Sequence, residues 1–164
     1  MKELLKRKQN RLQNYDYSQN GAYFVTICIK DKHELLWIPA FVGAHSVRPL
    51  LSDIGKVVEK AIMNIPQIYE TVIIDRYTIM PNHVHMIAII DCDHGRTLCA
   101  PTISRVIKQC KEYVTKQIGY SIWQKSFHDH IIRNEQDYIN IAEYIENNPA
   151  NWEIDRFFVV ANQS

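Results

Sequence analysis

The sequence predicts an α+β fold, in which an antiparallel sheet carries helices on one face and an additional helix follows at the C-terminal end. Strand-like runs and segments of helical period succeed each other in the order strand, helix, strand, strand, helix, strand, helix. This order contains the split βαβ unit of ferredoxin-like and RRM-like folds. At 164 residues the chain suits one hydrophobic core, so we expect a single domain over residues 1–164.

The first strand and the first helix have clear local signals. Residues 22–30, AYFVTICIK, are rich in aromatic and β-branched types, which favour a strand. Residues 51–65 show apolar side chains at helical spacing, with Ser52 or Asp53 where an N-cap belongs. We expect Pro66 to end this helix.

A strand pair follows. Residues 71–80 and 83–90 are strand-like and are separated by Pro81 and Asn82, which is typical of a tight turn. An antiparallel pair is therefore predicted, with Asn82 steadying the turn.

The last third of the chain predicts helix, strand and helix. Residues 102–118 carry an apolar stripe that begins after Thr102 or Ser104 and ends at Gly119. Residues 121–133 are strand-like, and residues 134–149 predict a helix that Asn134 caps and Pro149 ends.

Three segments show no regular pattern. Residues 1–20 are a basic N-terminal segment, residues 39–50 contain two prolines and a glycine and predict an irregular loop, and residues 150–164 form a short C-terminal tail.

Composition points to a cytoplasmic protein. No run approaches the roughly 18 apolar residues of a membrane span, and a signal-peptide pattern is absent. The four cysteines show no C-x-x-C pair, which favours reduced thiols.

A net charge of +1 gives little support for a nucleic-acid partner by itself. The distribution of charge is more informative, because cations gather in two segments that are either phosphate-facing strips or solvated surfaces. They are Lys2, Lys6, Arg7, Lys8 and Arg11, and Arg105, Lys108, Lys111 and Lys116.

His83 and His85 interrupt the apolar strand at residues 83–90. Side chains alternate along a strand, so both imidazoles project from the same face and can converge on one divalent metal ion. The alternative is a pair of polar positions on a solvated sheet face.

Tyr144 and Asn148 are four residues apart and therefore share one face of the last helix. A tyrosine can attack a phosphodiester, and an amide oxygen can serve as a third metal ligand. Tyr113 and Gln117 show the same spacing on the preceding helix, so spacing alone does not separate the two pairs. Tyr113 fits the apolar stripe of its helix, which favours Tyr144 as the reactive residue.

The strings PNHVH and YIENN, in this order and separation, resemble the single-tyrosine HUH transposases, especially the REP-associated tyrosine transposases and their insertion-sequence relatives. The resemblance extends from about residue 7 to residue 152. It implies that His83, His85 and Asn148 bind Mg²⁺ or Mn²⁺ and that Tyr144 is the nucleophile. The implied substrate is hairpin-flanked single-stranded DNA, which becomes joined to the tyrosine through its 5′-phosphate. The resemblance is compatible with a homodimer and with a monomer.

Further residues are candidates for DNA contact. His128 and His130 form a second H-x-H pair, and we expect His130 to contact DNA or to lie just outside the metal ligands. Trp123 and Phe127 could stack on unpaired bases. The basic candidates for phosphate contact are Arg7, Lys8, Arg11, Arg105, Lys108 and Arg133.

Two other functions fit the same sequence. One is a non-catalytic nucleic-acid-binding module of this fold with structural histidines, and the other is a metallohydrolase that activates water without a covalent intermediate.

Overall fold

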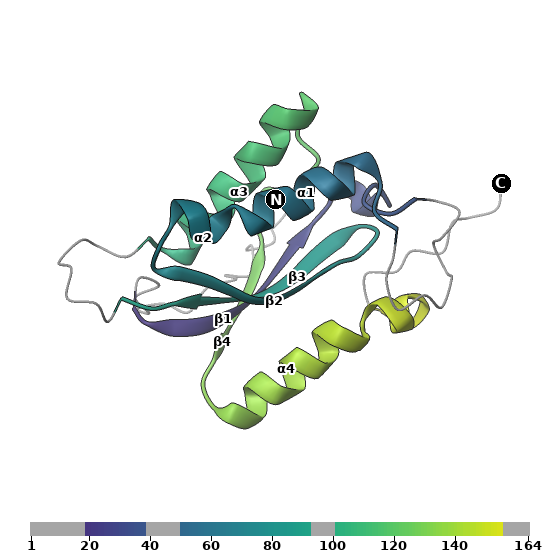
Figure 1. Ribbon diagram of the computed structural model, residues 1–164. Coiled ribbons are helices and arrows are strands. Elements are labelled where there is room, and N and C mark those ends of the chain that lie inside the picture. Colours follow the sequence, from purple (N-terminus) through teal and green to yellow (C-terminus); the bar gives the residue numbers. More distant parts are fainter. Residues whose placement is uncertain (1–18, 39–49, 93–100, 156–164) are drawn as a thin grey trace, which may run out of the picture.

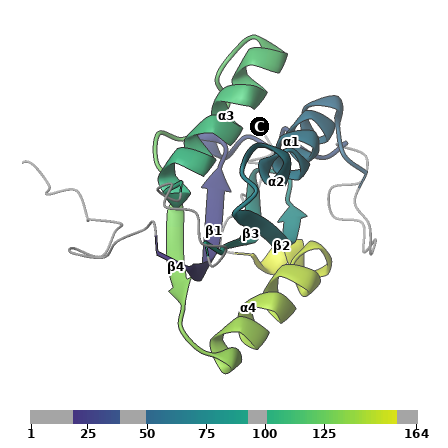
Figure 2. The same ribbon diagram turned by 60° about the vertical axis from the view of Figure 1, so that its left-hand side comes forward.

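A four-stranded antiparallel sheet is the centre of the computed structural model, which describes residues 19–38, 50–92 and 101–155. Its strands are β1 (Gly21–Cys28), β2 (Val72–Ile79), β3 (His83–Ile90) and β4 (His128–Ile132). They lie in the order β2-β3-β1-β4, and each neighbouring pair is antiparallel (Figure 2). The two histidines therefore belong to an inner strand.

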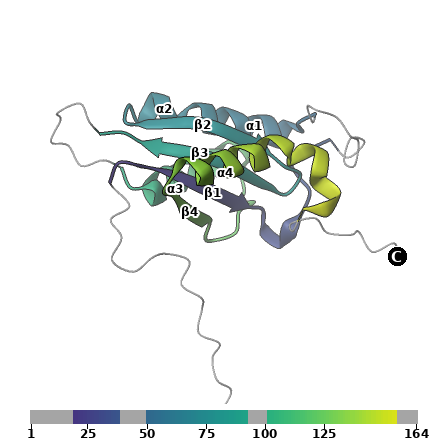
Figure 3. The same cartoon turned by 90° about the horizontal axis from the view of Figure 1, so that it is seen from below.

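Helices cover both faces of the sheet (Figure 1). On one face lie α1 (Asp53–Met63), the short α2 (Ile65–Ile68) and α3 (Ile103–Ile118). On the other face, α4 (Glu135–Asn147) runs across the sheet, as the view from below shows (Figure 3). The 3₁₀ helix η1 (Lys30–Lys32) follows β1, and the 3₁₀ helix η3 (Pro149–Ile154) follows α4.

The predicted caps are confirmed. The side chains of Ser52, Thr102 and Asn134 each accept a hydrogen bond from a backbone N–H in the first turn of their helix. Gly119 ends α3 with a φ of 86°, a left-handed conformation that favours glycine. The sequence therefore sets these helix limits locally.

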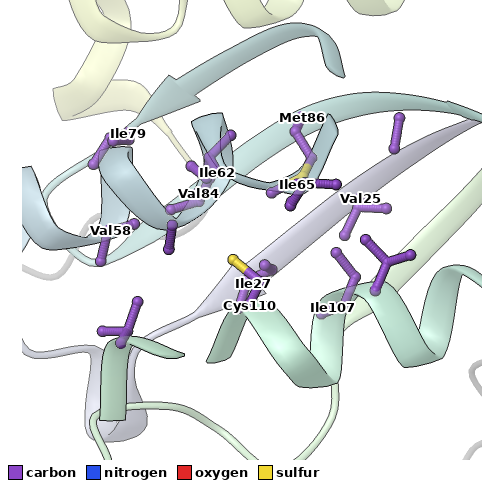
Figure 4. Packing of buried hydrophobic residues seen from close by; sticks show 14 of the residues in the cluster. Val25, Ile27, Val58, Ile62, Ile65, Ile79, Val84, Met86, Ile107 and Cys110 are labelled. Atoms are coloured by element: carbon purple, nitrogen blue, oxygen red, sulfur yellow. The ribbon is translucent and has the colours of Figure 1, made fainter. Parts of the chain in front are cut away.

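The main core fills the space between the sheet and α1, α2 and α3 (Figure 4). Val25 and Ile27 from β1 and Val84 and Met86 from β3 meet Ile107 of α3 there, and all are buried. Burial also raises the pKa of the Cys110 thiol on α3 to about 12, so this cysteine is an unreactive core residue.

The opposite face has a smaller apolar cluster beneath α4. Its buried members are Ile87 of β3 and Ala142 and Ile145 of α4. Partly buried residues around them include Phe24 and Ile141. This cluster holds α4 on the sheet next to the histidines.

The predicted fold class is confirmed, with three corrections of detail. Pro66 does not end the helical region, because a proline fits the first turn of a helix and α2 begins there. The last strand is shorter than predicted, since residues 121–127 contribute only an isolated bridge between Trp123 and Ile29. The tail is packed at its start, where Trp152 of η3 is buried.

No helix within the described residues is long and apolar enough to cross a membrane.

Candidate functional site

His83 and His85 project from β3 toward α4. Val84 between them points into the main core, as the alternation of a strand requires. Both imidazoles are fully buried, with 0% exposure, which excludes the solvated-face interpretation. Their Nε2 atoms lie 2.9 Å apart, so both rings are directed at one point.

The other nitrogen of each ring has a partner in a neighbouring loop or strand. Nδ1 of His83 lies 2.8 Å from Oδ1 of Asn82. Nδ1 of His85 lies 2.8 Å from Oγ1 of Thr26, which is paired with His85 across β1 and β3. Hydrogen bonds of this kind orient metal-binding histidines and select their tautomer.

The contacts of Asn82 determine the tautomer of His83. Nδ2 of Asn82 donates to the carbonyl oxygen of Lys32, so its Oδ1 faces His83 and requires an N–H at Nδ1. In the neutral ring, Nε2 of His83 then carries a lone pair directed at His85. Nε2 of His85, 2.9 Å away, either donates a hydrogen bond to this lone pair or shares a metal ion with it.

Tyr144 lies on the face of α4 that meets the histidines. Its hydroxyl is 3.2 Å from Nε2 of His85 and donates a 3.1 Å hydrogen bond to Oδ2 of Asp155. The ring stands edge-on to Phe24, which in turn stacks on His85. With 38% exposure, Tyr144 is reachable from solvent while its oxygen stays beside the buried imidazoles.

Asn148 follows α4 one turn after Tyr144 and is 3% exposed. Its Oδ1 is buried and has no hydrogen-bond partner within the described part of the chain. An orphaned amide oxygen is costly unless a ligand satisfies it. Together with two convergent imidazoles, it fits a divalent metal ion.

A surface pocket of about 420 Å³ opens beside these residues. Tyr144, Asn148 and Asp155 all line it. The pocket therefore gives an external molecule access to the tyrosine and to the end of α4.

The competing tyrosine lies elsewhere. Tyr113 packs against the main core and lines a groove of about 390 Å³ between α2 and α3. Both of these helices lie on the far side of the sheet from α4 (Figure 1). The structure thus separates two pairs that spacing left equivalent, and only Tyr144 lies beside the histidines.

Polar contacts attach α4 to the edge strand β2. A register shift in β2 lies at Asp75, whose Oδ2 accepts a 2.7 Å hydrogen bond from Tyr138. Arg76 forms an ion pair with Glu146, and its hydrogen bond with Tyr138 raises the pKa of the guanidinium. Tyr138 thus anchors the helix through its hydroxyl, besides packing against the small apolar cluster.

The second histidine pair has a different environment. The register of β4 on β1 places His128 and His130 on the same face as His85, and both are exposed. Nε2 of His130 lies 2.8 Å from Oδ2 of Asp137 in the first turn of α4. This hydrogen bond lowers the pKa of Asp137.

The basic candidates are dispersed. Arg105 and Lys108 line the groove between α2 and α3, away from Tyr144, whereas Arg133 is exposed where β4 leads into α4. Arg7, Lys8 and Arg11 lie outside the described residues.

The two candidate stacking residues differ in burial. Trp123 is 7% exposed in the main core, which makes it unsuitable as a stacking surface, and Phe127 is half-buried against the same core.

Sequence reasoning missed Thr26 and Asp155. Thr26 is an ordinary strand residue, and only the pairing of β1 with β3 brings it to His85. Asp155 lies seven positions beyond Asn148, and its place depends on how η3 packs. Neither has a local pattern that marks it.

Comparisons with known proteins find relatives across most of the chain. An uncharacterized protein of Haemophilus influenzae is 34% identical over 173 aligned positions, which cover 93% of this chain and 93% of that protein. A putative REP-associated tyrosine transposase of the same organism is 24% identical over 150 positions, covering 85% of this chain and 77% of that protein. No protein-family model matches.

A similar fold is found among solved structures. A REP-associated tyrosine transposase bound to a REP hairpin superposes with a TM-score of 0.61 at 21% identity, covering 87% of this chain and 74% of that chain.

The sheet places its paired histidines opposite a tyrosine on a helix, which is the arrangement that the resemblance to the single-tyrosine HUH transposases implies. The chain is thus similar to REP-associated tyrosine transposases in sequence and in fold.

Proposed function

We propose that this protein is a metal-dependent single-stranded DNA endonuclease and strand transferase that acts near hairpins through a 5′-phosphotyrosine intermediate. The observation that carries the proposal is the approach of the Tyr144 hydroxyl to within 3.2 Å of Nε2 of His85. It brings a nucleophile to two buried imidazoles that are already directed at one point.

His83, His85 and Asn148 would hold the ion, for which Mg²⁺ and Mn²⁺ are the proposed candidates. When bound there, it would neutralise negative charge on the scissile phosphate. Asn82 and Thr26 hold the two rings in place through their Nδ1 atoms. The nucleophile Tyr144 would thus approach the phosphate from α4, whereas the two histidine ligands of the ion come from the sheet.

The covalent step exchanges one phosphodiester bond for another. Oη of Tyr144 forms a bond to phosphorus, the bond from phosphorus to the 3′-oxygen breaks, and that oxygen leaves as a 3′-hydroxyl after gaining a proton. The phenol proton lost by Tyr144 balances the proton gained. Because the free phenol has a pKa of about 10, the tyrosine is a better leaving group than an alcohol. A DNA 3′-hydroxyl can therefore reverse the step without ATP.

The proposed DNA contacts divide by position. His130 and Arg133 lie on the side of α4 and would contact nucleotides near the scissile phosphate. Arg105 and Lys108 line the groove on the far face and would contact a more distant part of the DNA backbone. The similar solved structure is of a REP-associated tyrosine transposase bound to a REP hairpin, which supports a hairpin-containing substrate for this chain.

The direct test is adduct formation. The protein is incubated with hairpin-flanked single-stranded DNA and Mn²⁺ and then separated on a denaturing gel. We expect a covalent protein–DNA band that disappears in Tyr144→Phe. Tyr113→Phe is the matched control and should retain the band.

Other results would replace the proposal. Cleavage without an adduct would identify a metallohydrolase. Binding without either product, over a range of hairpins, would identify a non-catalytic binding module. Loss of the band in Tyr113→Phe, with Tyr144→Phe still active, would show that the nucleophile has been misassigned.

A further inference from the structure

Asp155 brings a carboxylate to the histidine pair. One of its oxygens and one nitrogen each of His83 and His85 all lie within 4.8 Å of one another. The same side chain accepts the 3.1 Å hydrogen bond from Tyr144. Asp155 therefore contacts the proposed nucleophile and lies within reach of the proposed ion.

The backbone around Asp155 is anchored to the site. Its N–H donates a 3.0 Å hydrogen bond to the carbonyl oxygen of Trp152, which closes the end of η3. Trp152 is 2% exposed, and its ring centroid lies 5.9 Å from that of His83 and 6.4 Å from that of Trp37. The residue that positions Asp155 thus packs directly against one of the proposed ligands.

The other donors at the site leave a chemical role for a carboxylate. Two imidazoles and an amide are neutral when they bind a metal, so they provide no compensating charge. Carboxylate oxygen is a preferred donor for Mg²⁺ and Mn²⁺. Asn148 lines the same pocket as Asp155, and its buried, unpartnered Oδ1 independently indicates that a ligand binds there.

We propose that Asp155 is a fourth ligand of the ion and that its carboxylate also holds the hydroxyl of Tyr144. An ionised carboxylate has about four acceptor positions on its two oxygens, so it can do both at once. His85 cannot bind the ion and accept a hydrogen bond from Tyr144 at the same time, because Nε2 has a single lone pair. Asp155 then keeps the hydroxyl beside the ion, as a positioning contact for the nucleophile. The inference rests on the proposed function and adds a ligand to it.

The test is Mn²⁺ affinity, measured by titration calorimetry on the full chain without DNA. We expect Asp155→Asn to weaken binding by about tenfold or more, because even groups that only orient a ligand change metal affinity about 10- to 100-fold. Glu153→Gln is the matched control. It removes the same charge from an exposed residue two positions away in η3, and its affinity should stay within about twofold.

A second measurement separates ligation from folding. The electron paramagnetic resonance spectrum of bound Mn²⁺ should change in Asp155→Asn and stay the same in Glu153→Gln, while the melting temperatures of both remain close to that of the unsubstituted protein.

Specific outcomes would overturn the inference. If Asp155→Asn binds Mn²⁺ as the unsubstituted protein does while His83→Ala loses binding, Asp155 is not a ligand and the proposed function still stands. Equal losses of Mn²⁺ affinity in Asp155→Asn and Glu153→Gln would show that only the net negative charge of this segment matters, and they would also exclude ligation by Asp155. If the unsubstituted protein binds no Mn²⁺, the inference fails, and the adduct assay decides separately whether Tyr144 reacts with DNA.

Discussion

The two faces of the sheet are built differently. The face under α1, α2 and α3 carries a large cluster of fully buried apolar side chains, including Ile62, Val84 and Ile107. The face under α4 has only Ile87, Ala142 and Ile145 as its buried apolar cluster. Beside that cluster, buried polar side chains stand where the other face has apolar ones, and they include Thr26, His83, His85 and Asn148.

This difference separates stability from chemistry. Apolar burial is the main favourable contribution to folding, so the first face should contribute most of the free energy of unfolding. The second face exposes Tyr144 and depends on polar contacts to place it. We expect substitutions on the first face to affect folding, and those on the second to affect metal binding and the rate of adduct formation.

The largest contrast should come from truncating one isoleucine on each face. Ile107→Ala should lower the free energy of unfolding by about 2–5 kcal/mol, because it opens a cavity in the closed core. Ile145→Ala should cost less, since partly exposed neighbours can close over the site, yet it should slow adduct formation by loosening α4. Chemical denaturation and single-turnover gel assays measure both quantities. Equal losses of stability would contradict the distinction between the faces.

Thr26 tests whether the polar face serves metal binding. Thr26→Val keeps the shape but removes the hydroxyl beside Nδ1 of His85, so we expect Mn²⁺ affinity to fall about 10- to 100-fold. Thr78→Val is the control, because Thr78 also pairs with His85 in the sheet but its hydroxyl lies near the sulfur of Met80. Titration calorimetry on both variants measures their Mn²⁺ affinities. Matching affinities in the two variants would exclude an orienting role for Thr26.

A smaller effect is expected where α4 is attached to β2. Tyr138→Phe removes the hydrogen bond to Asp75 and should lower the free energy of unfolding by about 1 kcal/mol. Mn²⁺ affinity should not change, whereas the rate of adduct formation should fall several-fold because Tyr144 is held less firmly. Tyr120→Phe, at an exposed position after α3, is the control. An unchanged rate in Tyr138→Phe would show that the apolar cluster positions α4 without this contact.

Local signals explain why much of the fold could be predicted from the sequence. A cap such as Ser52 acts within one helical turn, and the Pro81-Asn82 turn joins adjacent strands. The convergence of His83 and His85 also follows from local geometry, because alternation along one strand puts both on one face.

The remaining features depend on contacts between distant segments. Tyr113 and Tyr144 each have an amide side chain four residues further along the helix. Only the docking of α3 and α4 on opposite faces of the sheet distinguishes the two tyrosines. Thr26 needs the register of β1 on β3, and Asp155 needs the packing of Trp152 against His83. No pattern in a single segment contains that information.

The smallest expected effect concerns His130, whose hydrogen bond lowers the pKa of Asp137 below its ordinary value of 3.8. A carboxyl group with a lower pKa in the folded state stabilises the fold above that ordinary value, and the contribution is lost as pH falls through the lowered pKa. In His130→Ala, the pKa of Asp137 should rise, because the hydrogen bond from His130 is the largest cause of its lowered value. A carboxyl titration by nuclear magnetic resonance measures this shift, and His128→Ala, at an exposed position on the same strand, should leave it unchanged. Because the pair of His130 and Asp137 is partly exposed, the melting temperatures of His130→Ala and the unsubstituted protein should barely differ at neutral pH. A loss of stability as large as that of Ile107→Ala would show that the contacts at the start of α4 contribute far more to the stability of the fold than the small apolar cluster indicates.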